Sequence, residues 1–383
     1  MRITYVFHGR FPTEKAHGHQ VAQVCTALSR LGHAVTIVAP TVANNIAADP
    51  RAYYGLPSDV CVERLRHSDG FSLPLVPGFL KYAVTLLGYR RALRSYLGHH
   101  PSDLLYLRSP YLLRTVLRAT TPVLLELHDL PRRKRAAFAR LCNRCTRIVC
   151  LTTPLRKELI ERGVHPSRII VEGDAVDLRR FEQTPPSPAP LPPDELPKVP
   201  VIGYVGSLVT RDTLEKGVRE LLQACALLTK RGMSFRVKIT GGPQRWVEAY
   251  RALAKDFGIA SLVHFDGPVP SADVPAAIAA CNVCVYPAPG TNHPYFRRDT
   301  SPLKVFEYLA AGRPIVCADL PPLRDVLSEE TAVFCPPGDP AALADALEKV
   351  LRDPSLATSL AARGKELVRH HTWEERMKRV LSF

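Results

Sequence analysis

The stretch PPSPAPLPPDELPKVPVIGYVGSL, residues 185–208, decides the fold. Half of the residues from 185 to 200 are proline, which fixes φ and removes a backbone donor, so this part excludes a helix or a central strand. We expect an extended, semi-rigid linker there. The apolar run VIGYV, residues 201–205, is typical of the first strand of a new domain. The sequence therefore predicts an N-terminal domain over 1–184, a linker over 185–200 and a C-terminal domain over 201–369.

Short apolar strands alternate with helical segments on both sides of this linker. Such alternation is typical of parallel sheets with crossover helices, and it predicts an α/β fold of two Rossmann-like lobes facing a cleft. Ligands of these sheets bind outside the carboxyl ends of the strands. The expected strands are residues 3–7, 34–40, 103–108, 123–129 and 147–152 in the first half, and 201–206, 236–242, 262–267, 283–288, 314–319 and 332–336 in the second.

The 383 residues carry a formal net charge of +15, and 46% of them are hydrophobic. This composition excludes a disordered or fibrous protein. Residues 1–185 hold 27 basic and 14 acidic residues, whereas residues 186–383 hold 24 and 22, so the basic excess belongs to the first half. It indicates either an anionic partner, such as a membrane surface or a phosphorylated substrate, or a solvated arginine-rich surface. No helix-turn-helix and no basic–aromatic pattern is present, so we expect no nucleic-acid partner.

The cysteines and the first residues bear on location and metal content. Two C-x-x-C pairs, Cys142/Cys145 and Cys281/Cys284, lie more than a hundred residues apart, too far for a four-cysteine zinc site. We expect buried free thiols instead. The apolar run before His8 is too short for a signal peptide, and no run of about 18 apolar residues predicts a transmembrane helix. We therefore expect a cytoplasmic protein.

One segment combines a helix start with carboxylates, DTSPLKVFEYLAAGRPIVCAD at residues 299–319. Ser301 and Pro302 predict a helix N-terminus, with serine as the cap and proline at the first helical position. The free N–H groups of Leu303 and Lys304 would then form an anion site suited to a diphosphate, to which the lysine adds a charge.

The two carboxylates of this segment are Asp299 and Glu307, eight positions apart. Glu307 lies deep enough in the expected helix to accept hydrogen bonds from two neighbouring hydroxyls, as on a ribose. The alternative is that Asp299 only caps the helix and Glu307 is a surface charge. No D-x-D sequence is present to hold a metal at a nucleotide-sugar site.

This segment closely resembles the E-x7-E region of retaining GT-B glycosyltransferases of family 4 (glycosyl transferases group 1), with Asp299 in place of the first glutamate. The resemblance covers nearly the whole chain. It implies transfer of a sugar, with retention, from a nucleotide-diphosphate donor to a hydroxyl acceptor, with no metal and no other cofactor. It also implies that Glu307 holds the ribose, and that Asp299 and His128, in ELHDLP at 126–131, contact the transferred sugar.

Further matches assign the diphosphate and base contacts. GYVGSLVTRDTLEKGVRELLQA, residues 203–224, resembles the family's strand, loop and helix, which implies that Lys216 and the backbone at Gly206 contact the diphosphate. Many members carry arginine where this chain has Ser207, so the second basic contact is open among Arg211, Arg297 and Arg298. Gly241, in ITGGPQ, lies either at the base pocket or in a simple tight turn.

The N-terminal half carries weaker matches. Gly18 stands where many members have the second glycine of a pair near the donor phosphate, and His17 and His19 flank it. Residues 370–383 resemble the last helix of the family, which returns to the first lobe.

Residues 71–100 predict an amphipathic basic helix. It either rests on an anionic membrane, with the protein peripheral at the inner membrane face, or packs one face onto the sheet. Other functions left open are a GT-B nucleotide-sugar epimerase or phosphorylase, and a non-catalytic binder of anionic lipid or nucleic acid.

Overall fold

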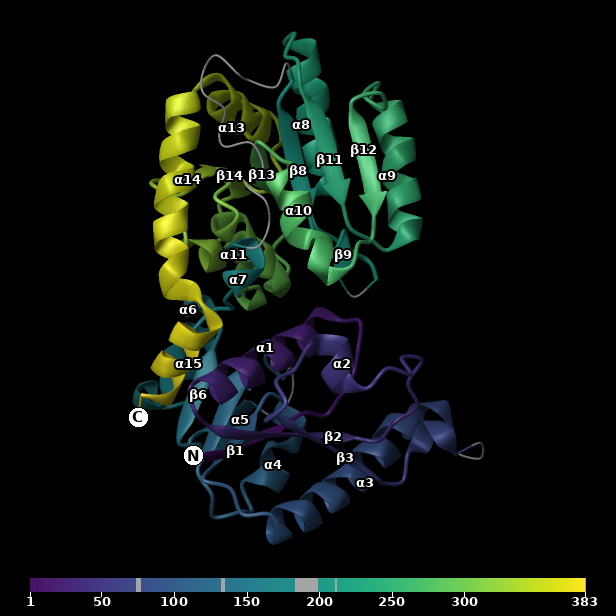
Figure 1. Ribbon diagram of the computed structural model, residues 1–383, viewed down its shortest axis with the longest axis vertical. Coiled ribbons are helices and arrows are strands. Elements are labelled where there is room, and N and C mark those ends of the chain that lie inside the picture. The colour runs from purple at the N-terminus through teal and green to yellow at the C-terminus, as the bar shows by residue number, and fades with distance from the viewer. Residues whose placement is uncertain (74–76, 132–134, 183–198, 211, 383) are drawn as a thin grey trace. The chain divides into compact units, whose positions relative to one another are not determined.

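The computed structural model describes residues 1–382 except 74–76, 132–134, 183–198 and 211 (Figure 1). The chain forms two compact units. Unit 1 is Met1–Gly173 with Trp373–Phe383, and unit 2 is Asp174–Thr372. Most of the proline-rich linker predicted at 185–200 lies outside the described residues, so the linker stays a prediction.

Unit 1 is built on a seven-stranded parallel sheet with the order β3-β2-β1-β4-β5-β6-β7. Its first strand pairs with β2 on one side and β4 on the other, so the order reverses there, as in doubly wound folds. The strands are β1 (Arg2–Val6), β2 (Ala34–Pro40), β3 (Cys61–Leu65), β4 (Leu104–Leu107), β5 (Val123–Leu127), β6 (Arg147–Cys150) and β7 (Ile169–Val171).

Helices lie on both faces of this sheet (Figure 1). Because both faces are covered, β4 and β5 are buried at every position and their sequences, LLYL and VLLEL, are almost continuously apolar. The last helix of the chain, α15, packs against α1 in this unit. The helices of unit 1 are α1 (Ala16–Arg30), α2 (Pro50–Tyr54), α3 (Gly78–His99), α4 (Leu113–Val116), α5 (Arg135–Cys142), α6 (Thr153–Glu161) and α15 (Trp373–Leu381).

Unit 2 repeats the plan with a six-stranded parallel sheet in the order β12-β11-β8-β13-β14-β15. Here the order reverses at β8, whose neighbours are β11 and β13. A short antiparallel pair, β9 (Val209–Thr210) and β10 (Leu214–Glu215), follows β8. The six strands are β8 (Val201–Val205), β11 (Arg236–Thr240), β12 (Val263–Gly267), β13 (Val283–Tyr286), β14 (Ile315–Ala318) and β15 (Val333–Cys335).

Two apolar clusters cover the two faces of this second sheet. One contains buried side chains of α8, α9 and α13, and the other contains those of α10, α11 and α12. The helices of unit 2 are α7 (Arg179–Glu182), α8 (Val218–Lys230), α9 (Gln244–Asp256), α10 (Val274–Ala279), α11 (Leu303–Ala310), α12 (Pro321–Arg324), α13 (Pro340–Arg352) and α14 (Pro354–Val368). The predicted fold class, two parallel α/β units, is confirmed.

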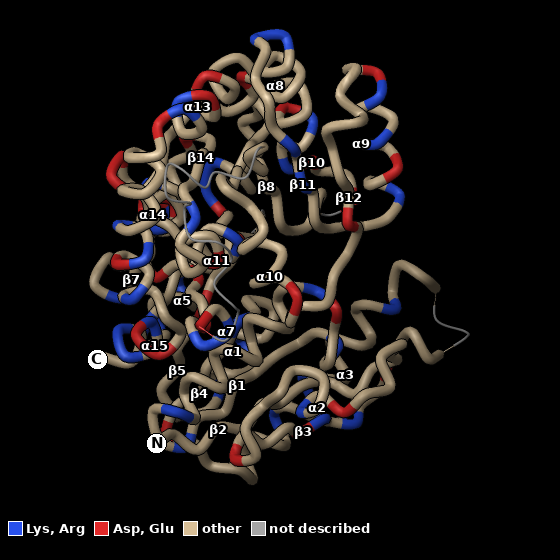
Figure 2. Tube along the Cα trace, turned by 45° about the horizontal axis from the view of Figure 1, so that its top comes forward, with Lys and Arg blue, Asp and Glu red and all other residues tan. Residues whose placement is uncertain are grey.

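Three further features of the described residues concern charge, cysteines and helix hydropathy. Lys and Arg alternate with Asp and Glu along the outer helices α9 and α13 of unit 2, in keeping with its near-neutral charge (Figure 2). Cys142, Cys145, Cys281 and Cys284 are buried free thiols, as expected. Within the described part of the chain, no helix is both long enough and apolar enough to span a membrane.

Candidate functional site

The site in unit 2 begins where β8 and β11 end, at Gly206 and Gly241. Both glycines have positive φ, 143° and 148°, which side-chain-bearing residues rarely adopt. The N–H of Gly206 donates to the carbonyl of Thr240 at 2.8 Å. A Cβ on Gly241 would lie 1.9 Å from the carbonyl oxygen of Gly206. The glycines therefore let two strand ends meet closely at the switch point of the sheet, which fits the tight-turn interpretation of Gly241.

Lys304 lies against this glycine turn. It is buried, and its Nζ donates to the hydroxyl of Tyr204 at 2.6 Å. A Cβ on Gly206 would come within 2.8 Å of the lysine Cε, so glycine is needed for the approach. Burial, followed by the nearby charge of Lys216, lowers the pKa of Lys304 well below its usual range, although Glu307 opposes this. The Lys304 ammonium is therefore poorly solvated, and an anion at this place would favour its charged form.

Lys216 stands just before α8. Its Nζ lies 5.5 Å from the centre of the Tyr295 ring, and its N–H donates to the carbonyl of Leu208 at 3.1 Å. Gly217 follows with φ of 83° and precedes the first helical residue. A Cβ on Gly217 would lie 2.5 Å from the backbone after β13, so this glycine brings the start of α8 to the carboxyl end of that strand.

The start of α11 differs from the prediction. The helix begins at Leu303, the cap position is Pro302, and Ser301 does not cap it. The Ser301 hydroxyl instead accepts the N–H of Asp174 at 2.7 Å. The prediction was wrong because a backbone N–H from more than a hundred residues away competes for the same oxygen. The first N–H groups of the helix, at Leu303 and Lys304, still lack intrahelical acceptors by geometry.

Glu307 lies one turn into α11 and is mostly buried. Its Oε1 is 3.9 Å from an Nη of Arg180, on α7. Burial raises the pKa of Glu307, while Arg180 and Lys304 lower it. Glu307 is therefore no ordinary surface carboxylate, which was the alternative interpretation.

Asp299 ends a single π-helical turn, Tyr295–Asp299, just before α11. Arg298 donates to both of its carboxylate oxygens, at 2.6 and 3.0 Å. Asp299 thus shares its charge with its neighbour. Of the other candidates, the Ser207 hydroxyl donates to the carbonyl of Val209 at 2.5 Å, and Arg211 lies outside the described residues.

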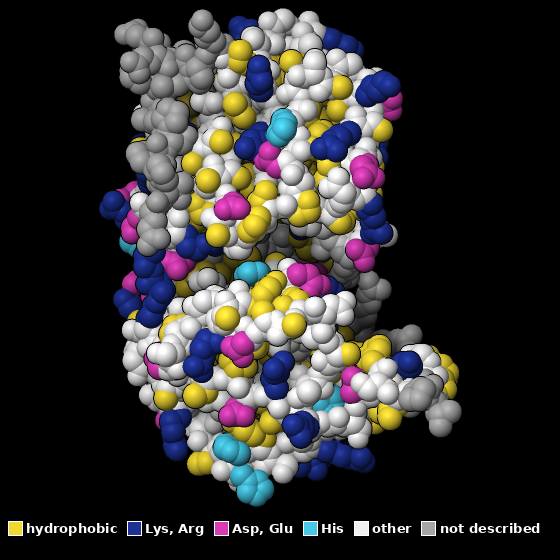
Figure 3. All heavy atoms as spheres, turned by 45° about the vertical axis from the view of Figure 1, so that its right-hand side comes forward, with side chains coloured by type: hydrophobic (Ala, Val, Ile, Leu, Met, Phe, Trp, Pro, Cys, Tyr) yellow, Lys and Arg dark blue, Asp and Glu magenta, His cyan; other side chains and the backbone are white. Residues whose placement is uncertain are grey.

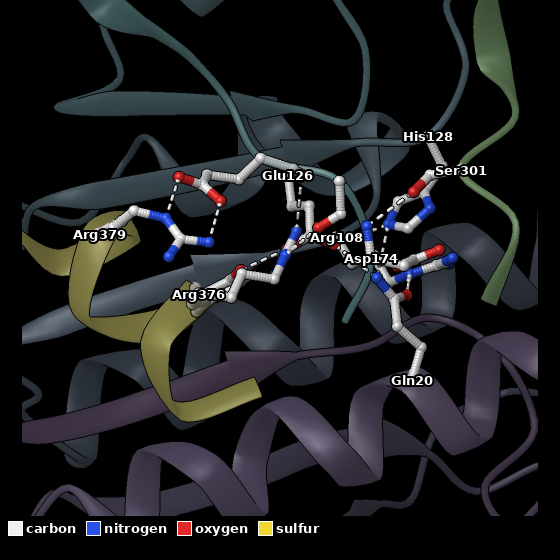
Figure 4. A network of polar contacts seen from close by, with 11 residues as sticks. Gln20, Arg108, Glu126, His128, Asp174, Ser301, Arg376 and Arg379 are labelled. Carbon is white, nitrogen blue, oxygen red and sulfur yellow. Dashed lines mark hydrogen bonds and ion pairs between the residues drawn. The ribbon is translucent and has the colours of Figure 1, made fainter. Parts of the chain in front are cut away.

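His128 follows β5 in unit 1, and its partner is Glu126 (Figure 4). The two side chains lie on the same face because strand residues two apart point the same way. The His128 Nε2 is 2.7 Å from the Oε1 of Glu126, which is fully buried. Burial and the charge of Arg108 lower the pKa of His128 to about 4, against the opposing effect of Glu126. The imidazole is therefore neutral near pH 7.

Three residues that the sequence did not single out complete this cluster. The Gln20 amide donates to Glu126 at 2.7 Å, and Arg108 Nε donates to the Gln20 oxygen, also at 2.7 Å. Arg376, on α15, places an Nη 3.2 Å from Glu126 Oε2. In the sequence, only Glu126 itself could have indicated this cluster, because a charge within the apolar strand VLLEL requires a buried partner.

The remaining N-terminal candidates have local packing partners. A Cβ on Gly18 would lie 2.2 Å from the Tyr54 hydroxyl and 2.5 Å from Thr13, so close packing of α1 explains this glycine. Burial, with Arg108, lowers the pKa of His17 to about 4. His19 has its ring against Tyr54. Nowhere in the described ranges do three or more His, Cys, Asp or Glu side chains gather as metal ligands.

Two family models match the two halves of the chain. Residues 17–180 match "Glycosyltransferase Family 4", and residues 199–353 match "Glycosyl transferases group 1". The chain is 28% identical over 257 residues to 2-deoxystreptamine glucosyltransferase of Streptomyces kanamyceticus, covering 66% of this chain and 60% of that protein. It is 29% identical over 188 residues to D-inositol 3-phosphate glycosyltransferase of Corynebacterium urealyticum, covering 47% and 42%. The matched part thus spans about half the length of these relatives.

The fold has a solved counterpart over its whole length. Anabaena HepE in complex with UDP and glucose superposes with a TM-score of 0.71 at 17% identity, covering 100% of this chain and 99% of that one. The fold and the strand-end clusters define a doubly wound α/β protein of the GT-B class. With both halves matched by the corresponding family models, the chain belongs to the family-4 glycosyltransferases, as its sequence motifs predicted.

Proposed function

We propose that this protein is a retaining glycosyltransferase that moves a sugar from a nucleotide-diphosphate donor to a hydroxyl acceptor without a metal ion. The observation that carries the proposal is Lys304, a buried ammonium against the glycine turn at Gly206 with the charge of Lys216 nearby. The charge of Lys216 acts on the poorly solvated Lys304, and a diphosphate would offset both charges. Family membership supplies the expectation of retention.

The reaction breaks the bond between the anomeric carbon and the diphosphate oxygen, which keeps the electron pair. The acceptor oxygen forms the new bond to that carbon, and its proton passes to the leaving diphosphate. Fixed cations and helix N–H groups placed where this charge develops lower the barrier. We assign that role to Lys216, Lys304 and the N–H groups that begin α11, at Leu303 and Lys304.

The other contacts follow the family resemblance. Glu307 is proposed to accept the two ribose hydroxyls, and its partly buried carboxylate suits that task. Asp299 in unit 2 and His128 in unit 1 are each proposed to contact the transferred sugar. The backbones at Gly18, Ser207 and Gly241 and the side chain of Arg211 stay donor-binding candidates.

The direct test is a thermal-shift screen with UDP, GDP, ADP and dTDP, each with and without a chelator. A nucleotide at a hundred times its dissociation constant stabilises the folded state by about 2.7 kcal/mol. We expect one nucleotide to give a chelator-insensitive shift, and UDP is the first candidate because the HepE structure contains it. The absence of any shift would refute the donor site, and sugar conversion that needs no acceptor would indicate an epimerase instead.

We further propose that unit 1 meets an anionic membrane surface through the first half of α3. Phe79 is 84% exposed, and Leu80, Tyr82 and Leu87 are also exposed on this helix, with Phe71 just before it. Figure 3 shows such hydrophobic side chains gathered at the projecting end of unit 1. The second half of the helix, with Tyr89 and Leu93, is anchored in the core.

The positive charge of α3 favours an anionic partner for this surface. Lys81 lies in the first half of the helix, Arg91 and Arg94 are exposed farther along it, and the helix has no acidic residue in its sequence. Exposed aromatic and aliphatic side chains beside cations fit the boundary of an anionic bilayer, where the side chains enter the acyl region and the cations meet the headgroups. We therefore place peripheral contact at the inner membrane face here.

A further inference from the structure

The carboxylate of Glu126 lies in the interior of unit 1. Glu126 is fully buried at the carboxyl end of β5, and a buried charge is costly unless it is paired and hydrogen-bonded. Burial alone would raise its pKa, but Arg376 and hydrogen bonds from His128 and Tyr106 hold the pKa of Glu126 well below its usual range. Glu126 is therefore ionised and only accepts hydrogen bonds.

The orientation of the Gln20 amide agrees with an ionised Glu126 that only accepts hydrogen bonds. Arg108 has no acceptor atom, so the Gln20 atom 2.7 Å from its Nε is the amide oxygen. The Gln20 nitrogen then faces Glu126 Oε1 at 2.7 Å as a donor. The same nitrogen is 3.2 Å from His128 Nε2, but an ionised oxygen at 2.7 Å is the stronger partner for that ring atom.

A ring nitrogen 2.7 Å from an ionised carboxylate must carry the hydrogen of that contact. Because His128 is neutral near pH 7, its other nitrogen, Nδ1, then has a lone pair and can only accept. A hydroxyl group can donate to it, whereas a carbonyl or phosphate oxygen cannot. The ring atom therefore selects for the hydroxyls of a sugar.

The counter-charge comes from the end of the chain. Arg376 is fully buried on α15, and it also donates to the carbonyls of Gly173 at 2.5 Å and Glu172 at 3.2 Å (Figure 4). Arg379, one turn on, pairs with the Glu172 carboxylate at 2.7 and 2.9 Å. These contacts together hold the Arg376 helix against the sheet that carries Glu126.

We propose that Glu126, paired with Arg376, is a positioning residue that fixes the Nε2–H tautomer of His128, so that Nδ1 accepts a hydrogen bond from a hydroxyl of the transferred sugar. The sugar contact of Nδ1 rests on the proposed function. The tautomer of His128 does not, because it is a property of the protein without substrate.

The tautomer is measured by two-bond 1H–15N correlation on the full-length protein with 15N-labelled histidine, with His128→Asn identifying the signal. We expect the protonated nitrogen of His128 to be Nε2. In Glu126→Gln the amide oxygen satisfies Tyr106 and Arg376, and its NH2 faces the ring, so the proton should move to Nδ1. The control Glu172→Gln should leave the ring unchanged. A wild-type signal from the Nδ1–H tautomer overturns the proposal even if Glu126→Gln does not fold.

Activity separates the two halves. Loss of one hydrogen bond to the transferred sugar corresponds to about a two- to tenfold change, and we expect that loss in kcat for Glu126→Gln with nucleotide affinity unchanged. An altered tautomer with unchanged kcat would overturn the sugar contact alone. If the wild type does not bind nucleotide, the proposed function is wrong, and the tautomer result still stands.

Discussion

The ammonium of Lys304 lies 3.8 Å from the centre of the Tyr204 ring and donates to its hydroxyl. The Tyr204 hydroxyl in turn donates to the carbonyl of Ser207 at 2.7 Å. The Tyr204 ring thus holds the Lys304 ammonium beside the glycine turn after β8, where water solvates the ammonium poorly. Under the proposed function, this arrangement would favour binding of an anion at the expense of the stability of the free protein.

The first prediction concerns that trade-off. Lys304→Met should abolish the nucleotide-induced thermal shift and leave the free protein at least as stable as the wild type near pH 7. The unfolded chain protonates Lys304 and the folded chain resists it, so wild-type unfolding free energy should rise with pH toward the usual lysine pKa. The variant should lack this rise, worth about 1.4 kcal/mol per pKa unit. The exposed Lys255→Met is the control, and a variant that still binds nucleotide contradicts the site.

The second prediction isolates the ribose contact. Glu307→Gln should weaken binding of a nucleoside diphosphate by about 10- to 150-fold, since one charge-assisted hydrogen bond contributes about 1.5–3 kcal/mol. Calorimetric titration with the ribonucleotide and its 2′-deoxy analogue is the measurement. The wild type should discriminate between the two ligands and the variant should not. Glu366→Gln, an exposed carboxylate paired with Arg369, should behave as the wild type. Equal discrimination by all three proteins would remove Glu307 from the site.

The third prediction tests the close approach at Gly206. Gly206→Ala should lower the unfolding free energy by more than about 1 kcal/mol and also weaken nucleotide binding, because the added methyl meets Lys304. Gly232→Ala is a matched control, since Gly232 also has positive φ, 76°, but an added methyl there would meet nothing within 4 Å. Urea denaturation and titration separate the two effects. Identical losses in both variants would mean that backbone strain alone matters.

The fourth prediction addresses the membrane surface. Phe79→Ser should reduce binding to vesicles that contain anionic lipid, and Arg91→Gln should weaken the same binding and make it less sensitive to salt. Sedimentation with anionic and with zwitterionic vesicles measures both, and Arg363→Gln on α14 is the charge control. Binding that ignores both lipid charge and Phe79 would rule out this surface.

The fifth prediction concerns the buried ion pair. Arg376→Met should lower the unfolding free energy by about 3–5 kcal/mol at pH 7, because Glu126 loses its counter-charge in the interior. The depressed pKa of Glu126 stabilises the wild type above the usual glutamate pKa, and this contribution is lost as the pH falls through the folded-state pKa. Arg369→Met, at an exposed pair, should cost less than about 1 kcal/mol. Denaturation curves that coincide for the two variants would contradict the argument.

The sequence predicted the features that depend on local sequence pattern, namely the strands and the residues at their ends. Apolar runs such as VIGYV and VLLEL located the strands, and strand ends located Gly206 and His128. It could not predict contacts between distant residues. Arg376 meets Glu126 across 250 positions, and Asp174 takes the Ser301 hydroxyl across 127, which no local spacing encodes. The stacking of Lys304 on Tyr204 likewise depends on the packing of α11 against β8.

The return of α15 to unit 1 has a consequence for synthesis. A growing chain exposes residues 1–173 first, but the counter-ion of Glu126 is residue 376, which leaves the ribosome much later. Unit 2 has all of its residues earlier, by residue 372. Residues 1–173 therefore cannot form the Glu126–Arg376 pair until residue 376 has been synthesised, and by then all of unit 2 has been made. Termination of synthesis before residue 376 would therefore remove a buried counter-ion from the unit whose other residues are made first.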